Sequence, residues 1–171
     1  MRRRRGLPLG ALLAGLAALN ACGYSFHGTL PAHIKTIGVL IFVNRTQQPA
    51  VESVITRAIV DAFATNGRLK IVRPDDADAV LDGEVIGYNV GPIAVDPSLG
   101  VQQYRLSVTL NLRMRDMRRN ELLFQQSGFS EQADFRVAGN VAQTLSVEAG
   151  ALQQAAVEIG RSVVSLALDR F

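Results

Sequence analysis

Residues 103–115 (QYRLSVTLNLRMR) alternate strictly between apolar and polar side chains. This period of two is that of a β-strand, in which successive side chains point to opposite faces of the sheet. One face is apolar and must be covered, whereas the other carries arginine, serine, threonine and asparagine and suits water. The apolar set is Tyr104, Leu106, Val108, Leu110, Leu112 and Met114. The chain therefore has to build a sheet with one buried face.

Four further segments have the composition of strands: residues 34–43, 68–73, 79–90 and 121–135. The first of them (IKTIGVLIFV) is rich in β-branched residues and is apolar at both parities, with Ile37, Val39, Ile41 and Val43 on one face and Leu40 and Phe42 on the other. Such a pattern is typical of a strand that is covered on both sides. We therefore expect residues 34–43 to be buried on both faces.

Two segments have helical periodicity. Residues 50–66 place apolar side chains on one stripe, follow Pro49, and end at Asn66-Gly67, a common helix stop. Residues 141–168 form a longer stripe through Leu145, Leu152, Ala156, Ile159, Val163 and Leu166. Both helices should bury that stripe on the sheet.

The connections complete the expected fold. Residues 44–46 (NRT) are expected to form a turn into the first helix, residues 116–120 (DMRRN) a hairpin, and residues 91–100, with two prolines, a longer loop. A strand, a helix and a strand in succession predict two parallel strands. The prediction is a two-layer α+β domain in β-α-β-β-β-β-α order, with a mixed sheet of four to five strands and two helices on one face.

The N-terminus resembles a lipoprotein signal peptide. Arg2 to Arg5 precede an apolar stretch, residues 7–19, that is too short for a permanent membrane span. Residues 19–22 (LNAC) resemble a lipobox, and Cys22 is the only cysteine. We expect cleavage after Ala21 and lipid attachment at Cys22, with residues 1–21 as the signal peptide, residues 22–33 as a lipidated tether and residues 34–171 as a periplasmic domain. Gly23 favours the outer membrane as its destination.

Charge and composition exclude several classes of protein. From Cys22 onward, fourteen Lys and Arg face fifteen Asp and Glu, because four of the eighteen basic residues are Arg2 to Arg5. This near balance argues against nucleic-acid binding. His27 and His33, the two histidines, are expected at the surface, and Asp75, Asp76 and Asp78 are expected to form a solvated turn. No catalytic motif is present, so we expect no enzyme, no cofactor and no metal site.

The order of short motifs resembles the LptE family of lipopolysaccharide-assembly lipoproteins. The resemblance rests on residues 22–28 (CGYSFHG), Leu30-Pro31 before the first strand, residues 42–46 (FVNRT) at its end, and residues 77–83 (ADAVLDG) after the second strand. It implies a domain that plugs the lumen of an LptD-type outer-membrane β-barrel, helps it to assemble and assists lipopolysaccharide transport. The alternative is a curli-channel-like or peptidoglycan-synthase-activator lipoprotein, since these share a strand, an N-R-T turn and a helix.

Two groups of residues are candidate contacts. Arginine offers phosphate a planar fork of donors, so lipopolysaccharide is predicted to meet the arginines of the alternating strand and its turn: Arg105, Arg113, Arg115, Arg118 and Arg119. The same residues could instead keep an exposed sheet face soluble. Ile93 and Val95, in the expected loop, are the predicted contacts with the barrel.

Overall fold

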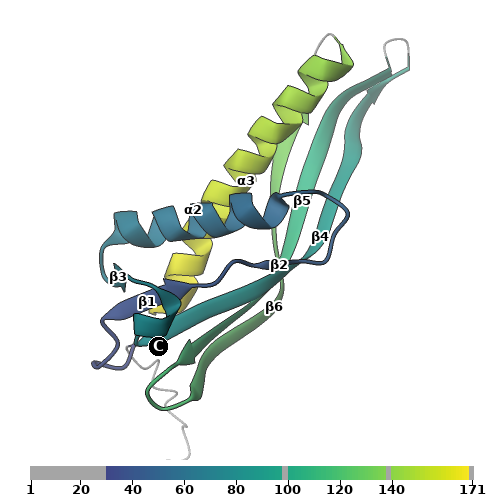
Figure 1. Ribbon diagram of the computed structural model, residues 1–171. Helices are drawn as coiled ribbons and strands as arrows, with labels where there is room; N and C mark the ends of the chain where they lie inside the picture. Colours follow the sequence, from purple (N-terminus) through teal and green to yellow (C-terminus); the bar gives the residue numbers. More distant parts are fainter. Residues whose placement is uncertain (1–29, 98–99, 138–139, 170–171) are drawn as a thin grey trace, which may run out of the picture.

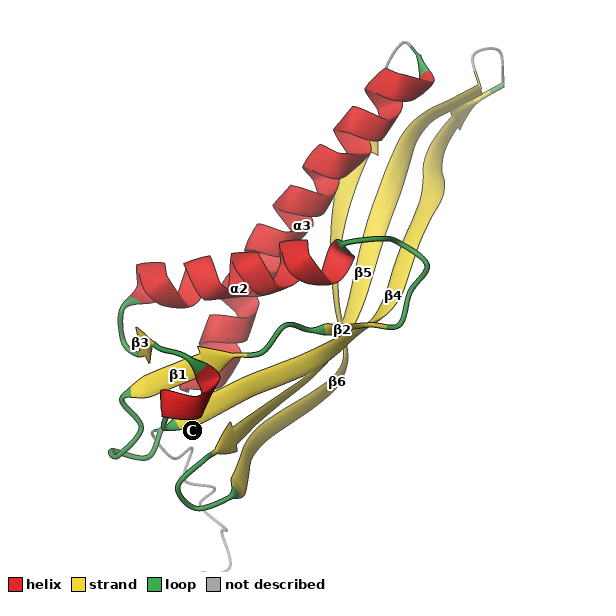
Figure 2. Cartoon of the chain, viewed as in Figure 1, coloured by secondary structure: helices red, strands yellow, loops and turns green. Residues whose placement is uncertain are grey.

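The computed structural model describes residues 30–97, 100–137 and 140–169. Within these residues, two α-helices pack against a mixed sheet of six strands, which confirms the predicted α+β class (Figure 2). The elements in chain order are β1 (Thr36–Val39), β2 (Val43–Asn44), α2 (Val51–Asn66), β3 (Lys70–Ile71), a short 3-10 turn (Pro74–Asp76), β4 (Ala79–Asp96), β5 (Gly100–Asp116), β6 (Glu121–Arg136) and α3 (Val141–Asp169).

The sheet has the strand order β3-β1-β4-β5-β6, and β2 also pairs with β4. β1 runs parallel to β3 and to β4, which confirms the predicted parallel pair around the first helix. β4, β5 and β6 are antiparallel and much longer than the other strands. In Figure 1 these three strands extend beyond the short ones and are accompanied there by the first half of α3. The domain thus has a broad end and a narrower arm.

The core lies between the helices and the inner face of β5. Five of the six apolar side chains predicted for that face, from Leu106 to Met114, are completely buried, and Tyr104 is partly buried and stacks on Phe135 of β6. α2 contributes Ile55, Ile59 and Phe63, and α3 contributes Ile159 and Val163. Leu145 is 59% exposed, however, because the first turns of α3 lie along the arm. The predicted apolar stripe of α3 is therefore buried only from about Ala151 onward.

The predicted loop over residues 91–100 is wrong, because β4 continues to Asp96 and β5 begins at Gly100. Proline has no amide hydrogen and is tolerated in a sheet only where no neighbouring strand needs one. Pro92 meets this condition, since β4 pairs only with β5 beyond Val85. Register shifts on either side of Ala94 accommodate the irregular sequence. The prolines and glycines of residues 91–100 therefore gave the end of an edge strand the sequence pattern of a loop.

The prediction that residues 34–43 form one strand covered on both faces is also wrong. Val39 lies opposite Leu81, but Val43 lies opposite Glu84, so β1 and β2 are separated by one extra residue. This bulge turns Phe42 into the core, where its ring lies against Gly83. The Phe42 amide donates to Thr56 Oγ1 of α2 at 3.1 Å. Ile41 and Val43 are left exposed, because no helix or strand of the described chain covers the outer face of the sheet there.

Both helices have the predicted extents, and none of the described helices combines the length and apolarity needed to cross a membrane. Asn44 organises the approach to α2: its Oδ1 accepts from the Thr46 amide, and its Nδ2 donates to Glu52. α2 ends at Asn66 and is capped by Gly67, whose φ of 71° is the left-handed conformation that glycine adopts without strain. α2 and α3 cross closely at Gly160, where an added Cβ would lie 2.7 Å from the Ala58 carbonyl oxygen.

This crossing yields the first prediction. Gly160→Ala should lower the free energy of unfolding by about 1–3 kcal/mol, because the new methyl meets backbone rather than a movable side chain. Gly150→Ala in the same helix has nothing within 4 Å of the new Cβ and should raise stability by up to about 1 kcal/mol through helix propensity. Urea denaturation measures both values. Two variants that both gained stability would contradict the close crossing.

Candidate functional site

Three of the arginines predicted to bind lipopolysaccharide, Arg105, Arg113 and Arg115, lie on the outer face of β5, and the other two, Arg118 and Arg119, lie in the turn that follows it. Arg105 donates to both carboxylate oxygens of Asp134, its partner across the β5–β6 pair, at 2.7 and 2.8 Å. Arg113 donates through Nε and Nη2 to one carboxylate oxygen, Oδ2, of Asp82, its partner on β4. The Arg105 guanidinium in turn lowers the pKa of Asp134. Arg105 and Arg113 therefore each form an exposed ion pair with an aspartate on the neighbouring strand, a common arrangement across a β-sheet.

The remaining three arginines lie at the end of β5 and in the turn after it. Arg118 pairs with Asp78 at 2.7 Å. Arg115 donates to the side-chain oxygen of Asn120 at 3.4 Å, and neither Arg115 nor Arg119 has a carboxylate partner among the described residues. Arg113, Arg115, Arg118 and Arg119 thus gather at one end of the sheet. Arg105 lies eight residues away along the strand, roughly 26 Å.

Two buried carboxylates hold this end of the sheet together. Asp78 Oδ2 accepts hydrogen bonds from the Lys35 and Thr36 amides, both at 3.0 Å, and from the Thr36 hydroxyl. Asp116 accepts from the amides of Arg118 and Arg119, closing the β5–β6 hairpin, and lies 2.7 Å from His33 Nε2. The Met117 amide donates to the Asp78 carbonyl, which links the two groups. These hydrogen bonds therefore connect the start of β1 with the β5–β6 hairpin turn.

Hydrogen bonds lower the pKa of both carboxyl groups, Asp78 and Asp116, despite their burial. The Lys35 amide, together with the Thr36 hydroxyl, the Thr36 amide and Arg118, lowers the pKa of Asp78 from 3.8 to about 2 against the opposing effect of burial. Burial would raise the pKa of Asp116, but the Arg119 amide, His33 and the Arg118 amide outweigh it and the pKa is lowered. Both groups are therefore ionised acceptors in the folded protein.

Sequence reasoning missed this pair. Asp75 and Asp76 are exposed, as expected for a solvated turn, but Asp78 is only 9% exposed, because it is the last residue before β4. His33 is partly buried against Asp116 rather than at the open surface. An Asp that begins a tight hairpin often accepts amides two and three residues further on, and this signal could have identified Asp116.

Ile93 and Val95, the predicted barrel contacts, are 42% and 65% exposed, on the last part of β4 rather than on a loop. Leu145 and Val147 of α3 are also exposed large apolar residues of the arm. The predicted lipid-attachment residue Cys22 lies outside the described residues. Leu30, at the start of the described chain, packs against the core.

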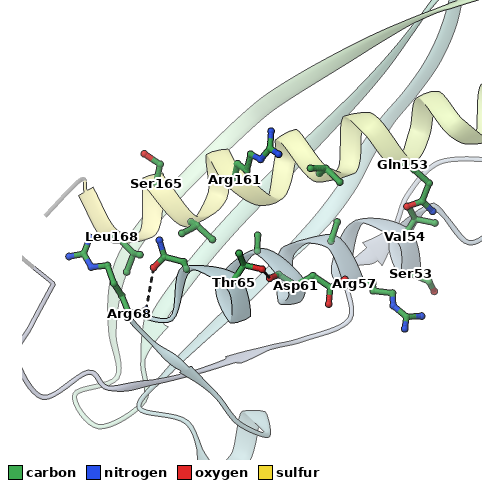
Figure 3. Close-up of a pocket in the computed structure, with 15 residues that line it drawn as sticks. Ser53, Val54, Arg57, Asp61, Thr65, Arg68, Gln153, Arg161, Ser165 and Leu168 are labelled. Carbon is green, nitrogen blue, oxygen red and sulfur yellow. Dashed lines mark hydrogen bonds between the residues drawn. The ribbon is translucent and has the colours of Figure 1, made fainter.

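An open groove of about 930 Å³ runs between α2 and α3 (Figure 3). Its lining combines small and apolar side chains, among them Val54, Val157 and Leu168, with the guanidinium groups of Arg57, Arg68 and Arg161. Arg161 pairs with Glu158 one turn away on α3. In the described part of the chain, no three His, Cys, Asp or Glu side chains come together as metal ligands would.

Comparison with solved structures places this fold among bacterial proteins that include lipoproteins. A protein from Caulobacter crescentus CB15 has a TM-score of 0.54 at 14% identity, over 77% of this chain and 87% of its own. A minor lipoprotein from Acinetobacter baumannii has a TM-score of 0.52 at 12% identity, over 78% of this chain and 90% of its own. At these identities the likeness concerns the fold.

A family model described as "LptE: Lipopolysaccharide-assembly" matches residues 34–166, and the chain belongs to this family. The match spans most of the chain and confirms the family indicated by the sequence motifs. A comparison with curated protein sequences finds no match.

The carboxylate pair yields a pH prediction. The folded-state pKa of Asp78 is depressed, so its stabilisation is present above about pH 4 and is lost as the pH falls through 3.8 toward 2. Asp78→Asn should therefore cost about 2 kcal/mol at pH 7 and flatten the fall in stability between pH 4 and 2. Urea denaturation at several pH values measures this. Asp75→Asn, at an exposed position of the same segment, is the matched control, and equal losses for the two variants would refute the role of Asp78.

Proposed function

We propose that this chain is an outer-membrane lipoprotein that plugs an LptD-type β-barrel, helps that barrel to assemble, and assists transport and insertion of lipopolysaccharide at the outer membrane. The family-model match over residues 34–166 carries the proposal. On this proposal the chain acts as a binding partner, without a catalytic role, a cofactor or a nucleic-acid ligand.

Lipidation at Cys22 is the second part of the proposal. The arginine-led apolar segment and the lipobox-like LNAC support it. Cys22 precedes Leu30, which packs against the core, by eight positions, so the part of the tether between these two residues spans at most about 28 Å. A domain on so short a tether stays beside the membrane that holds its lipid. Several acyl chains anchor a protein stably, whereas one holds only marginally.

Lipopolysaccharide recognition is the third part. Phosphate groups would have to compete with Asp134, Asp82 and Asp78 for Arg105, Arg113 and Arg118. Phosphate could bind Arg115 and Arg119 without displacing a carboxylate from either guanidinium group. We therefore assign first contact with the phosphates to Arg115 and Arg119, with the paired arginines following. Ile93 and Val95 support barrel contact, because their exposed apolar surface lies on the arm.

Anchoring and partnership are tested together by affinity purification from outer membranes. Labelled palmitate should enter the wild-type chain but not Cys22→Ala, and an outer-membrane β-barrel should co-purify with the wild type. Cys22→Ser gives a second unlabelled control that keeps a polar side chain at the site. Equal labelling of wild type and variants would refute lipidation. Purification with a curli-type pore or a peptidoglycan synthase would refute the barrel assignment.

Arg115→Glu combined with Arg119→Glu should weaken lipopolysaccharide binding at least tenfold, since two attractive contacts become repulsive. Thermal stability should change little, because neither guanidinium has a carboxylate partner within the described chain. Arg57→Glu with Lys70→Glu makes the same change in net charge at exposed positions elsewhere. Binding measured at low and high salt should weaken with ionic strength for the wild type. A stable double variant with unchanged affinity would exclude Arg115 and Arg119 from the site.

A further inference from the structure

The outer face around β2 carries exposed apolar side chains beside the Arg45–Glu84 ion pair. The bulge between β1 and β2 directs Phe42 inward, where it is 2% exposed, and leaves its neighbours Ile41 and Val43 at 74% and 46%. Residues 34–43 have the sequence of a strand buried on both faces, yet the described chain covers only one. The sequence thus provides an apolar surface for which the domain itself has no covering layer.

The edge of β4 beside this surface is open. β2 pairs with β4 only as far as Val85, and from there to Asp96 the described residues pair with β4 on its β5 side alone. In Figure 2 this stretch of β4 forms the border of the sheet along the arm. The backbone groups that face away from β5 are therefore available to another strand.

The open edge lacks the charges that usually protect such strands. Residues 86–95 (IGYNVGPIAV) contain no charged side chain, whereas β6, the opposite border of the sheet, carries Glu121, Glu131, Asp134 and Arg136. Charged side chains on an edge strand discourage pairing with other chains, and proline ends it. Pro92 therefore limits the open edge to Gly87–Gly91, about five residues, the length of an ordinary strand.

The uncovered surface and the open edge meet at Ile86. Ile86 is the extra residue of a bulge in β4, because Val85 lies opposite Leu110 and Gly87 lies opposite Thr109, and its side chain is 41% exposed. Val43 lies opposite Glu84 in the parallel β2–β4 pair, and Ile86 follows Glu84 two residues further along β4. Ile41, Val43 and Ile86, hereafter the apolar shoulder, thus lie where the open edge begins.

We propose that the β4 edge over Gly87–Gly91 binds an extended segment of the β-barrel partner, whose side chains cover the apolar shoulder. The inference rests on the proposed function for the identity of the partner. Residues 86–95 carry no charged side chain, so a charge on the bound segment would be desolvated along this edge without a counter-charge there. A segment that is uncharged along the edge and turns apolar side chains toward the apolar shoulder therefore fits best. All strands of a closed barrel are paired on both sides, so the segment is a loop or a terminal extension of that protein.

The test uses the full chain co-expressed with the barrel partner. Val43→Lys combined with Ile86→Lys should reduce the amount of barrel that co-purifies at least tenfold, because two ammonium groups would be buried under the bound segment. Met117→Lys with Leu122→Lys is the matched control, since these side chains are exposed to a similar degree and lie at the hairpin end of the sheet, away from Gly87–Gly91. Hydrogen exchange at the Gly87–Gly91 amides that face away from β5 should be fast in the free protein and slow in the complex.

Each outcome distinguishes the inference from the proposed function. Full co-purification of the Val43 and Ile86 double variant, or unchanged exchange at these amides in an intact complex, would overturn the β4 site while the barrel partnership stands. Failure of the wild type to capture a barrel would overturn both. Concentration-dependent protection in the free protein, with dimers seen by light scattering, would overturn the barrel segment in favour of a second copy of this chain.

Discussion

The domain depends on the inner face of β5. β5 is the strand with long neighbours on both sides, so its backbone hydrogen bonds are satisfied on each edge while its alternate side chains fill the core. Full burial of a large apolar side chain contributes about 1.5–3 kcal/mol, and β5 buries five in succession. The short strands β1, β2 and β3 join the sheet only through β4 or through each other. A disturbance of β5 therefore reaches every other strand.

The same strand explains why much of the fold could be predicted. Alternation over residues 103–115 defines a strand and its buried face without reference to the rest of the chain, and the two helical stripes are equally local signals. The two failures concern information that is not local. Pro92 is compatible with a strand only at an edge, and the edge exists because β2 ends at Asn44. Similarly, the reversed parity around Phe42 results from a bulge against β4.

In the candidate site, too, local sequence signals were predictable and contacts between distant segments were not. The sequence places Arg105 and Arg113 on one face, but their partners Asp134 and Asp82 come from neighbouring strands through a register that a single sequence does not reveal. Asp78 looks like a member of an acidic turn until the start of β1 comes beside it and donates two amides. The residue types therefore indicated where charged side chains would lie. The strand register determines which arginines are paired with a carboxylate and which are left for a ligand.

The fastening of β1 by Asp78 has a mechanical consequence. A tether that precedes Leu30 would transmit any pull from a membrane into residues 30–36, and thus into the first residues of β1. There the Asp78 carboxylate holds the Lys35 and Thr36 amides, and His33 is joined to the hairpin through Asp116. β1 also pairs with β3 on one side and β4 on the other, so its backbone is held along both edges. A pull on residues 30–36 would therefore meet side-chain contacts to Asp78 and Asp116 as well as the strand pairing of β1.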